Sequence, residues 1–295
     1  MPDAARRTVS VVIPTLDGGR DALRLWQHLQ AQLSRGRLHE VLVIDSGSRD
    51  GTVEAAESAG LRVHRLANGE FGHGRTRQLG VTMTTGEVIA FLTQDVLPVT
   101  PDWPARFAAA FADPAIAGVY GRQVPRDATT MEMFFVALNY PATPLRFDPR
   151  PGGHAPRPGR VLFSNAFSAV RRTVIEHVPF PAHADFSEDQ LWAHAALAAG
   201  HSIAYVPGAE ALHAHRYTLD GLFQRSASIG RALSRQGLAG GANFRESLRF
   251  LTNEVRYFVH QGHVHRLPQL LSYEFLRWAG FQWGRRMGAR MVARG

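Results

Sequence analysis

The stretch Val88-Ile-Ala-Phe-Leu-Thr-Gln-Asp95 decides the fold of this chain. Its first five residues are apolar and fit a buried strand, and an aspartate follows them before Pro98 ends the run. The segment Val41-Leu-Val-Ile-Asp45 has the same design. Open parallel sheets bind ligands just beyond the carboxyl ends of their strands, where a carboxylate suits a hard divalent cation that also binds diphosphate oxygens. The two aspartates therefore predict a nucleotide-diphosphate site, although each alone could equally cap the next turn or helix.

Further apolar runs alternate with helical patterns along the first two thirds of the chain. We expect strands at Val9–Pro14, Leu61–Leu66 and Ile203–Val206, and helices at Asp21–Leu33, Val53–Ala59, Thr76–Met83 and Leu191–Ala199. This alternation predicts an α/β fold, a mainly parallel open sheet with helices on both faces. The segment 142–160 is rich in Pro and Gly, which predicts a long loop. Beyond it we expect a boundary near residue 216, with one domain over 1–216 and a helical C-terminal segment over 217–295.

Composition narrows the class of protein. The chain has 295 residues, 45% of them hydrophobic, and no cysteine, so disulfides and thiolate metal sites are excluded. No secretory signal and no apolar run of about 18 residues is evident, so we expect a cytoplasmic protein without a spanning helix. The net charge is +8, and all of its cationic residues are arginine. These form no dense run within a nucleic-acid-reading module, so we expect no nucleic-acid partner.

Six motifs follow one another along the chain. They are Val11–Thr15, Val43–Thr52, Phe71–Arg77, Phe91–Asp95, Glu188–Ala193 and His213–Leu219. In this order they resemble family 2 glycosyltransferases with the Rossmann-like glycosyltransferase-A fold, and most closely their bacterial rhamnosyltransferase-like branch. The resemblance implies an inverting enzyme of polysaccharide biosynthesis. It would move a sugar from a nucleotide-diphosphate donor, with dTDP-rhamnose as one candidate, to a glycan or lipid-linked acceptor.

The resemblance also implies which residues bind the donor. It places Pro14, Thr15 and Asp45 around the nucleobase, and Gln94 and Asp95 at the donor as well. Arg75 and Arg77 are candidate phosphate contacts, because a guanidinium group matches phosphate oxygens in a bidentate fashion. The alternative is that both are ordinary surface arginines.

A divalent metal, Mg²⁺ or Mn²⁺, is implied as cofactor, with Asp95 as a ligand and the metal as a Lewis acid on the leaving diphosphate. The common family motif has two acidic residues flanking a third position, whereas Thr93-Gln-Asp95 has one, a form typical of the rhamnosyltransferase-like branch. One carboxylate makes an incomplete cage, so His213 or His215 is predicted as a further ligand. The two histidines lie two residues apart and would share a side of an extended chain; a structural role for both is the alternative.

Asp189 is the predicted catalytic base, with Glu188 beside it at the start of an apolar helix. A helix N-terminus stabilises an ionised carboxylate, and in the family this aspartate faces the acceptor hydroxyl. The alternative is a capping pair in the first turn after Ser187, without a catalytic role. Asn165 and Trp192 are expected on the acceptor side.

The last helical stretch, residues 267–295, interleaves aromatic and basic residues. On a helix, Leu270, Glu274, Trp278 and Phe281 share a face. Such a helix suits an anionic membrane surface, and so a peripheral membrane protein. Docking on the first domain or on a second subunit is equally compatible, so an oligomer stays open.

Two other classes of protein compete with the glycosyltransferase. A sugar-phosphate nucleotidyltransferase also uses a doubly wound sheet, but its arginine-containing Gly-rich loop normally follows the first strand, and residues 15–19 contain no arginine. A non-enzymatic basic protein that binds membranes or nucleic acid is the other alternative. Strand-terminal carboxylates argue against it, because without a metal they would repel phosphate.

Overall fold

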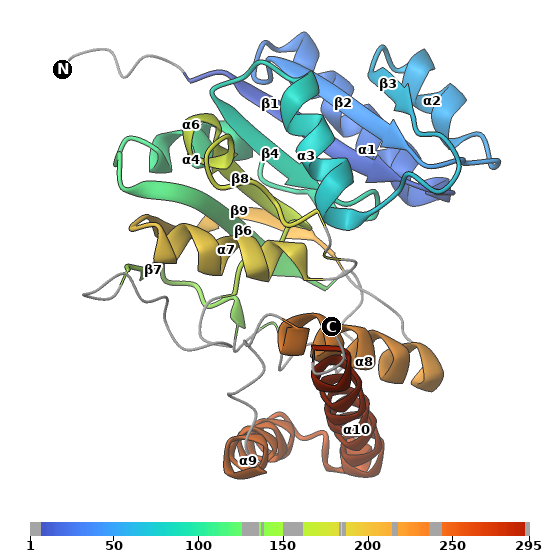
Figure 1. Ribbon diagram of the computed structural model, residues 1–295, viewed down its shortest axis with the longest axis vertical. Coiled ribbons are helices and arrows are strands. Elements are labelled where there is room, and N and C mark those ends of the chain that lie inside the picture. Colours follow the sequence, from blue (N-terminus) through green and yellow to red (C-terminus); the bar gives the residue numbers. More distant parts are fainter. Residues whose placement is uncertain are drawn as a thin grey trace.

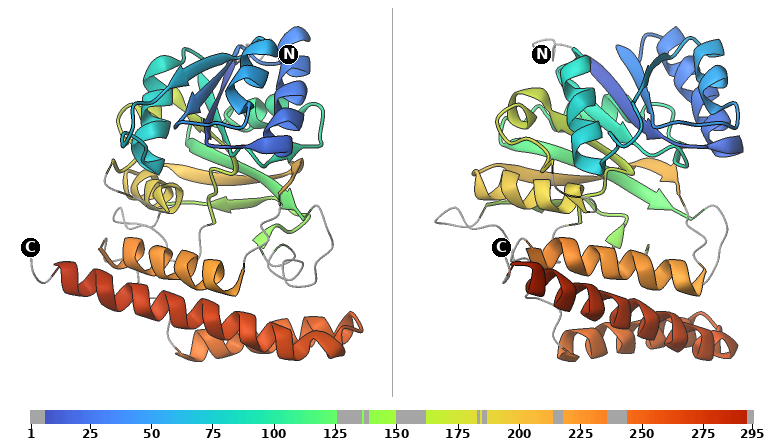
Figure 2. Two further views of the ribbon diagram at one scale, coloured as in Figure 1. Left: turned by 90° about the vertical axis from the view of Figure 1, so that its right-hand side faces the viewer. Right: turned by 45° about the vertical axis from the view of Figure 1, so that its right-hand side comes forward.

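A computed structural model of the chain describes residues 7–125, 136, 139–149, 162–182, 184, 187–213, 218–235 and 244–292. The molecule has two parts that lie one above the other (Figure 1). An α/β part holds the sheet and its covering helices, and a layer of long helices from the C-terminal third lies beneath it. Figure 2 shows the same two layers from two further sides.

The first half of the sheet is parallel, as the sequence predicts. It contains β1 (Val9–Thr15), β2 (Glu40–Asp45), β3 (Arg62–Arg65) and β4 (Val88–Leu92) in the order β3-β2-β1-β4. The helices α1 (Gly19–Ser34), α2 (Thr52–Ser58) and α3 (His73–Met83) connect them. The register pairs Thr15 with Asp45, so two residues predicted at the nucleobase end neighbouring strands.

The second half of the sheet is mixed, and most of its strands were not recognised in the sequence. It contains β8 (Phe167–Arg171), β6 (Ile116–Val124), β9 (Ser202–Leu212), β5 (Leu97–Pro98) and β7 (Leu145–Phe147). β8 is antiparallel to β4 and β6, β9 is parallel to β6, and both short strands are antiparallel to β9. β7 falls within the predicted long loop, of which residues 150–160 lie outside the described part.

Helices cover both faces of the sheet, so the predicted α/β fold is confirmed. On one face, α1 and α4 (Trp103–Ala110) bury Trp26, Trp103 and Phe107. On the other face, α3, α6 (Arg172–Ile175) and α7 (Glu188–Ala198) lie over Phe91 and Phe163. Both layers of the core consist of fully buried side chains.

The C-terminal segment is helical, as predicted, and consists of α8 (Leu219–Arg235), α9 (Phe244–His260), the short 3₁₀ helix η2 (Val264–Arg266) and α10 (Leu267–Val292). The helices α8 and α10 pack closely against each other through small residues. A methyl group at Gly284 would collide with the carbonyl oxygen of Ala227, and one at Gly280 would lie 2.5 Å from that of Phe223. Close backbone approach of this kind needs glycine. The face predicted for α10 does not pack as a unit, because Leu270 is buried while Trp278 is exposed.

Two further expectations concern a domain boundary near residue 216 and the lack of a membrane-spanning helix. The boundary expected near residue 216 falls among residues outside the described part and stays a prediction. Within the described ranges, none of the helices combines the length and the apolar content needed to cross a bilayer.

Candidate active site

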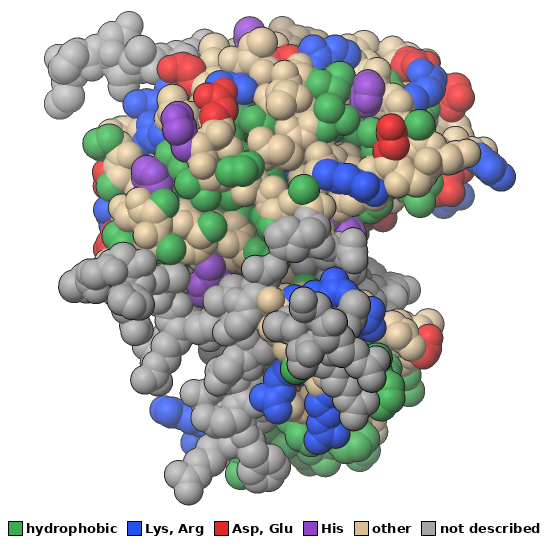
Figure 3. Space-filling view, viewed as in Figure 1, with side chains coloured by type: hydrophobic (Ala, Val, Ile, Leu, Met, Phe, Trp, Pro, Cys, Tyr) green, Lys and Arg blue, Asp and Glu red, His purple; other side chains and the backbone are tan. Residues whose placement is uncertain are grey.

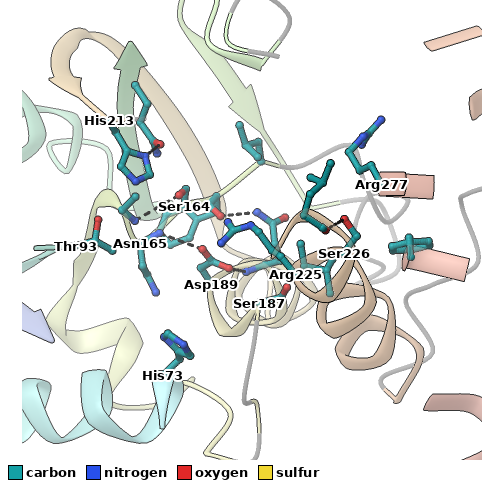
Figure 4. A pocket seen from close by; sticks show the side chains of 18 of the residues that line it. His73, Thr93, Ser164, Asn165, Ser187, Asp189, His213, Arg225, Ser226 and Arg277 are labelled. Carbon is teal, nitrogen blue, oxygen red and sulfur yellow. Dashed lines mark hydrogen bonds between the residues drawn. The ribbon is translucent and has the colours of Figure 1, made fainter. Parts of the chain in front are cut away.

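A cavity of about 1350 Å³ lies between the carboxyl edge of the sheet and the helical layer. Its walls come from the loops after β1 and β4, the start of α7, the end of β9, and the helices α8, α9 and α10 (Figure 4). Most residues predicted for the site meet here: Pro14, Thr15, Arg77, Gln94, Asp95, Asn165, Glu188, Asp189 and His213. Segments distant in the sequence thus form one site.

Asp45 lies next to the cavity without lining it. Its buried carboxylate accepts hydrogen bonds from the backbone N–H groups of Gly47 (2.9 Å) and Ser48 (3.1 Å) and from the Ser48 hydroxyl. These contacts fold the loop after β2 so that Ser46 faces the cavity. A carboxylate offers about four acceptor positions, so Asp45 retains capacity for a ligand. Its contact with the nucleobase stays a prediction.

Gln94 fastens two cavity loops to each other. Its Nε2 donates to the carbonyl oxygen of Leu16 (2.8 Å), and its Oε1 accepts from the Leu16 N–H (2.9 Å). A carboxylate at this position could accept from the backbone but not donate to it. Gln94 occupies the middle position of the motif, whereas Thr93 stands where the common family motif has its first acid. Gln94 therefore holds the loop after β1 against the loop after β4.

Asp95 and His213 approach each other from β4 and β9. The distance from His213 Nε2 to Asp95 Oδ2 is 3.6 Å. His213 Nδ1 lies 2.7 Å from Gln123 Oε1, an acceptor, so Nδ1 carries the proton and Nε2 is directed to Asp95. A hydrogen-bonded imidazole beside a carboxylate is a typical arrangement for a metal ligand pair. These two side chains fit a divalent cation.

The protein offers few other ligands for such a cation. In the described ranges no three His, Cys, Asp or Glu side chains gather closely enough to hold a metal ion. His215, the other predicted ligand, lies outside the described residues. A cation at Asp95 and His213 would therefore take its remaining ligands from diphosphate oxygens and water, as Mg²⁺ does in many phosphate sites.

Arg77 is buried and forms an ion pair with Glu188 across α3 and α7. The Nη1–Oε1 distance is 2.7 Å, and the two side chains are only 5% and 6% exposed. Asn165 Nδ2 donates to the same oxygen of Glu188 (3.1 Å), and Ser168 Oγ donates to Asn165 Oδ1 (2.9 Å). The alternative that Arg77 is a surface arginine is therefore wrong. Arg75 does not line the cavity, because its guanidinium group binds the carbonyl oxygens of Gly69 and Phe71.

Asp189 follows Glu188 and points into the cavity (Figure 4). Its carboxylate accepts from the backbone N–H groups of Gln190 (2.8 Å) and Asn165 (3.2 Å). Burial, and then the negative charge of Glu188, raise the pKa of Asp189 to about 7, against the opposing effect of Arg77. A carboxyl with such a pKa suits general base catalysis near neutral pH. The capping alternative is weakened, because the Ser187 side chain makes no capping hydrogen bond.

Trp192 requires a correction, because it lies in the core and not on the acceptor side. It is fully buried, its Nε1 donates to the carbonyl oxygen of Val178 (2.8 Å), and its ring lies 5.0 Å from that of Phe163. A Cβ at Gly118 of β6 would lie 2.7 Å from the Trp192 ring, so the indole fills the space that this glycine leaves. An aromatic residue three positions after a site residue can serve the core or the ligand, and its packing partner was not recognisable in the sequence.

Several cavity residues were not recognised in the sequence. Gln123, which orients His213, lies near the end of β6, a strand that was not predicted, so no sequence pattern indicated its role. Arg225 of α8, Glu254 of α9 and Arg277 of α10 line the wall that the helical layer provides. Their signal was present only as charged residues within amphipathic helices, which usually face solvent.

The fold has counterparts among solved structures. The mannosyltransferase PcManGT from Pyrobaculum calidifontis, in complex with GDP-Man and Mn²⁺, superimposes with a TM-score of 0.59 at 19% identity. The match covers 99% of this chain and 75% of that one. The shared fold is of the glycosyltransferase-A type, as predicted.

Sequence comparison identifies the family. The model described as Glycosyl transferase family 2 matches residues 10–178. The O-antigen chain rhamnosyltransferase RfbN of Salmonella typhimurium is 31% identical over 290 residues, and WbaN of Salmonella anatum, which bears the same description, is 28% identical over 289. Each match covers 94% of this chain and 89% of the relative. The chain therefore belongs to glycosyltransferase family 2 and is a glycosyltransferase, which confirms the predicted class of enzyme over the two competing classes.

The Arg77–Glu188 pair provides a test of stability. Replacing Arg77 by Ala leaves a buried carboxylate without its cation, which should lower the free energy of unfolding by about 3–5 kcal/mol. Urea denaturation followed by circular dichroism measures this. Arg106→Ala is the matched control, because the Arg106–Asp102 pair is exposed and should contribute nothing measurable. Equal effects of the two substitutions would contradict the structural role of the buried pair.

Proposed function

We propose that this enzyme transfers a sugar from a nucleotide-diphosphate donor, with inversion at the anomeric carbon, to a hydroxyl group of a glycan or lipid-linked acceptor. One observation carries the proposal: Asp95 with His213, and Asp189, line the same cavity. The two relatives described as O-antigen chain rhamnosyltransferases support dTDP-rhamnose as the first donor to test, and polysaccharide biosynthesis as the setting.

The donor side of the cavity has a cation-binding pair and two fixed loops. Asp95 and His213 would hold Mg²⁺ or Mn²⁺, which when bound supplies positive charge for the leaving diphosphate. The Mn²⁺ in the PcManGT complex supports a metal of this kind. Gln94 keeps the loop that contains Thr15 and Leu16 against the loop that contains Asp95. The donor thus meets a preorganised surface.

The acceptor side has the base. Asp189 takes the proton from the acceptor hydroxyl as its oxygen bonds to the anomeric carbon and the bond from that carbon to the diphosphate oxygen breaks. The N–H groups of Asn165 and Gln190 fix the carboxylate in one orientation. Burial, and then the charge of Glu188, which Arg77 and Asn165 hold in place, keep the pKa of Asp189 high enough for efficient proton acceptance.

The metal pair can be tested by nucleotide binding. We expect Asp95→Asn to abolish the increase in dTDP or UDP affinity that Mn²⁺ produces, because the carboxylate is one of the two proposed protein ligands. Isothermal titration with and without Mn²⁺ measures this. Asp102→Asn, a substitution of an exposed carboxylate on α4's N-terminal side, is the control and should leave the increase intact. An unchanged Mn²⁺ effect in Asp95→Asn would refute the assignment.

The base can be tested by kinetics. We expect Asp189→Asn to lower kcat by about 10²–10⁴-fold while donor affinity stays unchanged, since only proton acceptance is lost. In the wild type, kcat/KM should rise with pH and level off above about 7, because the ionised carboxylate is the active form. Glu188→Gln removes a charge that raises this pKa, so the rise should move to lower pH. Turnover retained by Asp189→Asn would exclude Asp189 as base.

We further propose that the helical layer contacts an anionic membrane surface. Large apolar side chains that do not line the cavity are exposed there, among them Val264 (54%) and Trp283 (56%). Arginines outnumber acidic residues in the same segment, and basic and apolar side chains gather over this layer in Figure 3. Apolar side chains flanked by arginines match an anionic bilayer in both chemistry and charge. A cytoplasmic, peripheral location is the corresponding expectation.

Vesicle binding tests the membrane contact. The chain should sediment with vesicles that contain phosphatidylglycerol more strongly than with phosphatidylcholine alone, and salt should weaken the binding. Trp283→Ser should reduce it, whereas Leu23→Ser, at an exposed apolar residue of α1, should not. Equal binding to both kinds of vesicle, or a concentration-dependent dimer that buries Trp283, would favour a subunit contact instead.

A further inference from the structure

Glu254 of α9 is a buried carboxyl that the proposed chemistry does not use. The residue is 2% exposed and lines the cavity. Its Oε2 has no hydrogen-bond partner within the described ranges. A buried polar atom without a partner is costly, and such an atom at a cavity wall indicates a ligand that supplies the missing hydrogen bond.

The neighbours of Glu254 indicate the charge of that ligand. Glu274 and Arg277 of α10 form an ion pair, with Arg277 Nε 2.8 and 3.0 Å from the two carboxylate oxygens. The Arg277 guanidinium group also stacks over the ring of Phe250, 4.9 Å from its centroid. The charge of Arg277 is therefore matched within the protein by Glu274, so Arg277 does not call for a phosphate group beside Glu254. A neutral polar ligand fits it better.

Burial, and then the charge of Glu274, raise the pKa of Glu254 to about 8. Near neutral pH the side chain is therefore mainly a neutral acid, which can both donate and accept a hydrogen bond. A hydroxyl group has the same capacity, so the two complement each other. A free carboxylate ligand or a cation would pair less well with a neutral acid.

Apolar and aromatic side chains of the same two helices, α9 and α10, also line the cavity. They are Leu251, Tyr273, Phe275 and Trp278, and the last two are exposed. Binding sites often combine such apolar walls with a few polar groups that fix orientation. A sugar ring presents hydroxyl groups at its edge and C–H groups on its faces. It therefore matches both components of the wall.

The position of this wall fits the geometry of transfer. In Figure 4, His213 lies to the upper left of Asp189 and Arg277 lies to its upper right, so the two residues belong to different parts of the cavity wall. With the donor on the His213 side, the side of Arg277 is where an acceptor would extend away from the reacting hydroxyl. A displacement with inversion requires the two substrates to approach from opposite sides of the anomeric carbon.

We propose that Glu254, the Glu274–Arg277 pair and the aromatic residues Phe275 and Trp278 form a subsite for a neutral sugar residue of the acceptor, with Glu254 as its hydrogen-bonding recognition group. The inference rests on the proposed function, because it assigns the acceptor to the same cavity. It adds that the protein recognises the acceptor by a sugar residue, and that α9 and α10 provide the specificity for this sugar.

Binding of simple glycosides to the intact chain tests the subsite. Methyl α-L-rhamnoside, methyl α-D-mannoside and methyl α-D-galactoside serve as probes, with saturation-transfer NMR as the measurement. We expect at least one probe to bind the wild type. Glu254→Leu, which removes both hydrogen-bonding functions, should weaken that binding by about tenfold or more. Glu254→Gln, which can still donate and accept, should retain it, as should the control Asp220→Leu at an exposed position of α8.

Melting temperature and donor hydrolysis distinguish a lost subsite from a misfolded or inactive protein. Glu254→Leu removes a buried carboxyl whose Oε2 lacks a hydrogen-bond partner, so its melting temperature should not fall. Trp278→Ala, which removes an exposed ring from the wall, should also weaken glycoside binding. Slow hydrolysis of a nucleotide sugar without acceptor, measured on the wild type and on the control Asp220→Leu, reports on the proposed function alone and should be equal in these two proteins. No binding of any probe to the wild type, or equal binding to the wild type and Glu254→Leu, overturns the subsite even if hydrolysis is normal.

Discussion

The buried ion pair between Arg77 and Glu188 is the constraint on which the rest of the site depends. It joins α3 to the start of α7, and Asn165, just before β8, binds the same carboxylate oxygen. Removing two charges from water costs several kcal/mol per ion, so such a pair needs close geometry and added hydrogen bonds to persist. Both are present. Because Asp189 is the next residue after Glu188, the pair fixes the position of the proposed base and contributes to its electrostatic environment.

Two glutamine amides hold side chains and loops in place on the proposed donor side of the cavity. Gln94 binds both the N–H and the C=O group of Leu16, and Gln123 Oε1 accepts a hydrogen bond from His213 Nδ1–H. A carboxylate could not replace either amide. At position 94 it could not donate to the Leu16 carbonyl oxygen, and at position 123 its negative charge would favour a charged imidazolium at His213. A neutral imidazole is the form that binds a metal. Asp95, the single acid of this motif, thus supplies the negative charge, while Gln94 fixes the neighbouring loop and Gln123 orients His213.

The sequence predicted what depends on continuous local pattern. The central residues of β1, β2 and β4 are almost all apolar because these strands are buried on both faces, and the terminal residues of parallel strands meet at one edge of the sheet. β6 escaped recognition because Gly118 and Gly121 interrupt it, and these glycines exist to admit the rings of Trp192 and Phe167. The pairing of Arg77 with Glu188 and the contact of His213 with Gln123 were not recognised, because the partners come from distant segments. Pairing between such segments depends on topology, which the linear pattern does not record.

In the helical layer, small residues form the contact between helices and large apolar residues are exposed, which the aromatic pattern of α10 did not predict. In most helices the large apolar residues are buried and the small ones are incidental. Here the contact between α8 and α10 uses Gly280 and Gly284, while Phe275 and Trp283 stay exposed. Close packing through glycine brings the backbones together and leaves the large side chains for other surfaces. Phe275 lines the cavity, whereas Trp283 does not, so a ligand can cover the first and only an external surface can cover the second. The same helix can therefore serve an acceptor on one side and a bilayer on the other, which is the arrangement that a sugar attached to a membrane lipid would require.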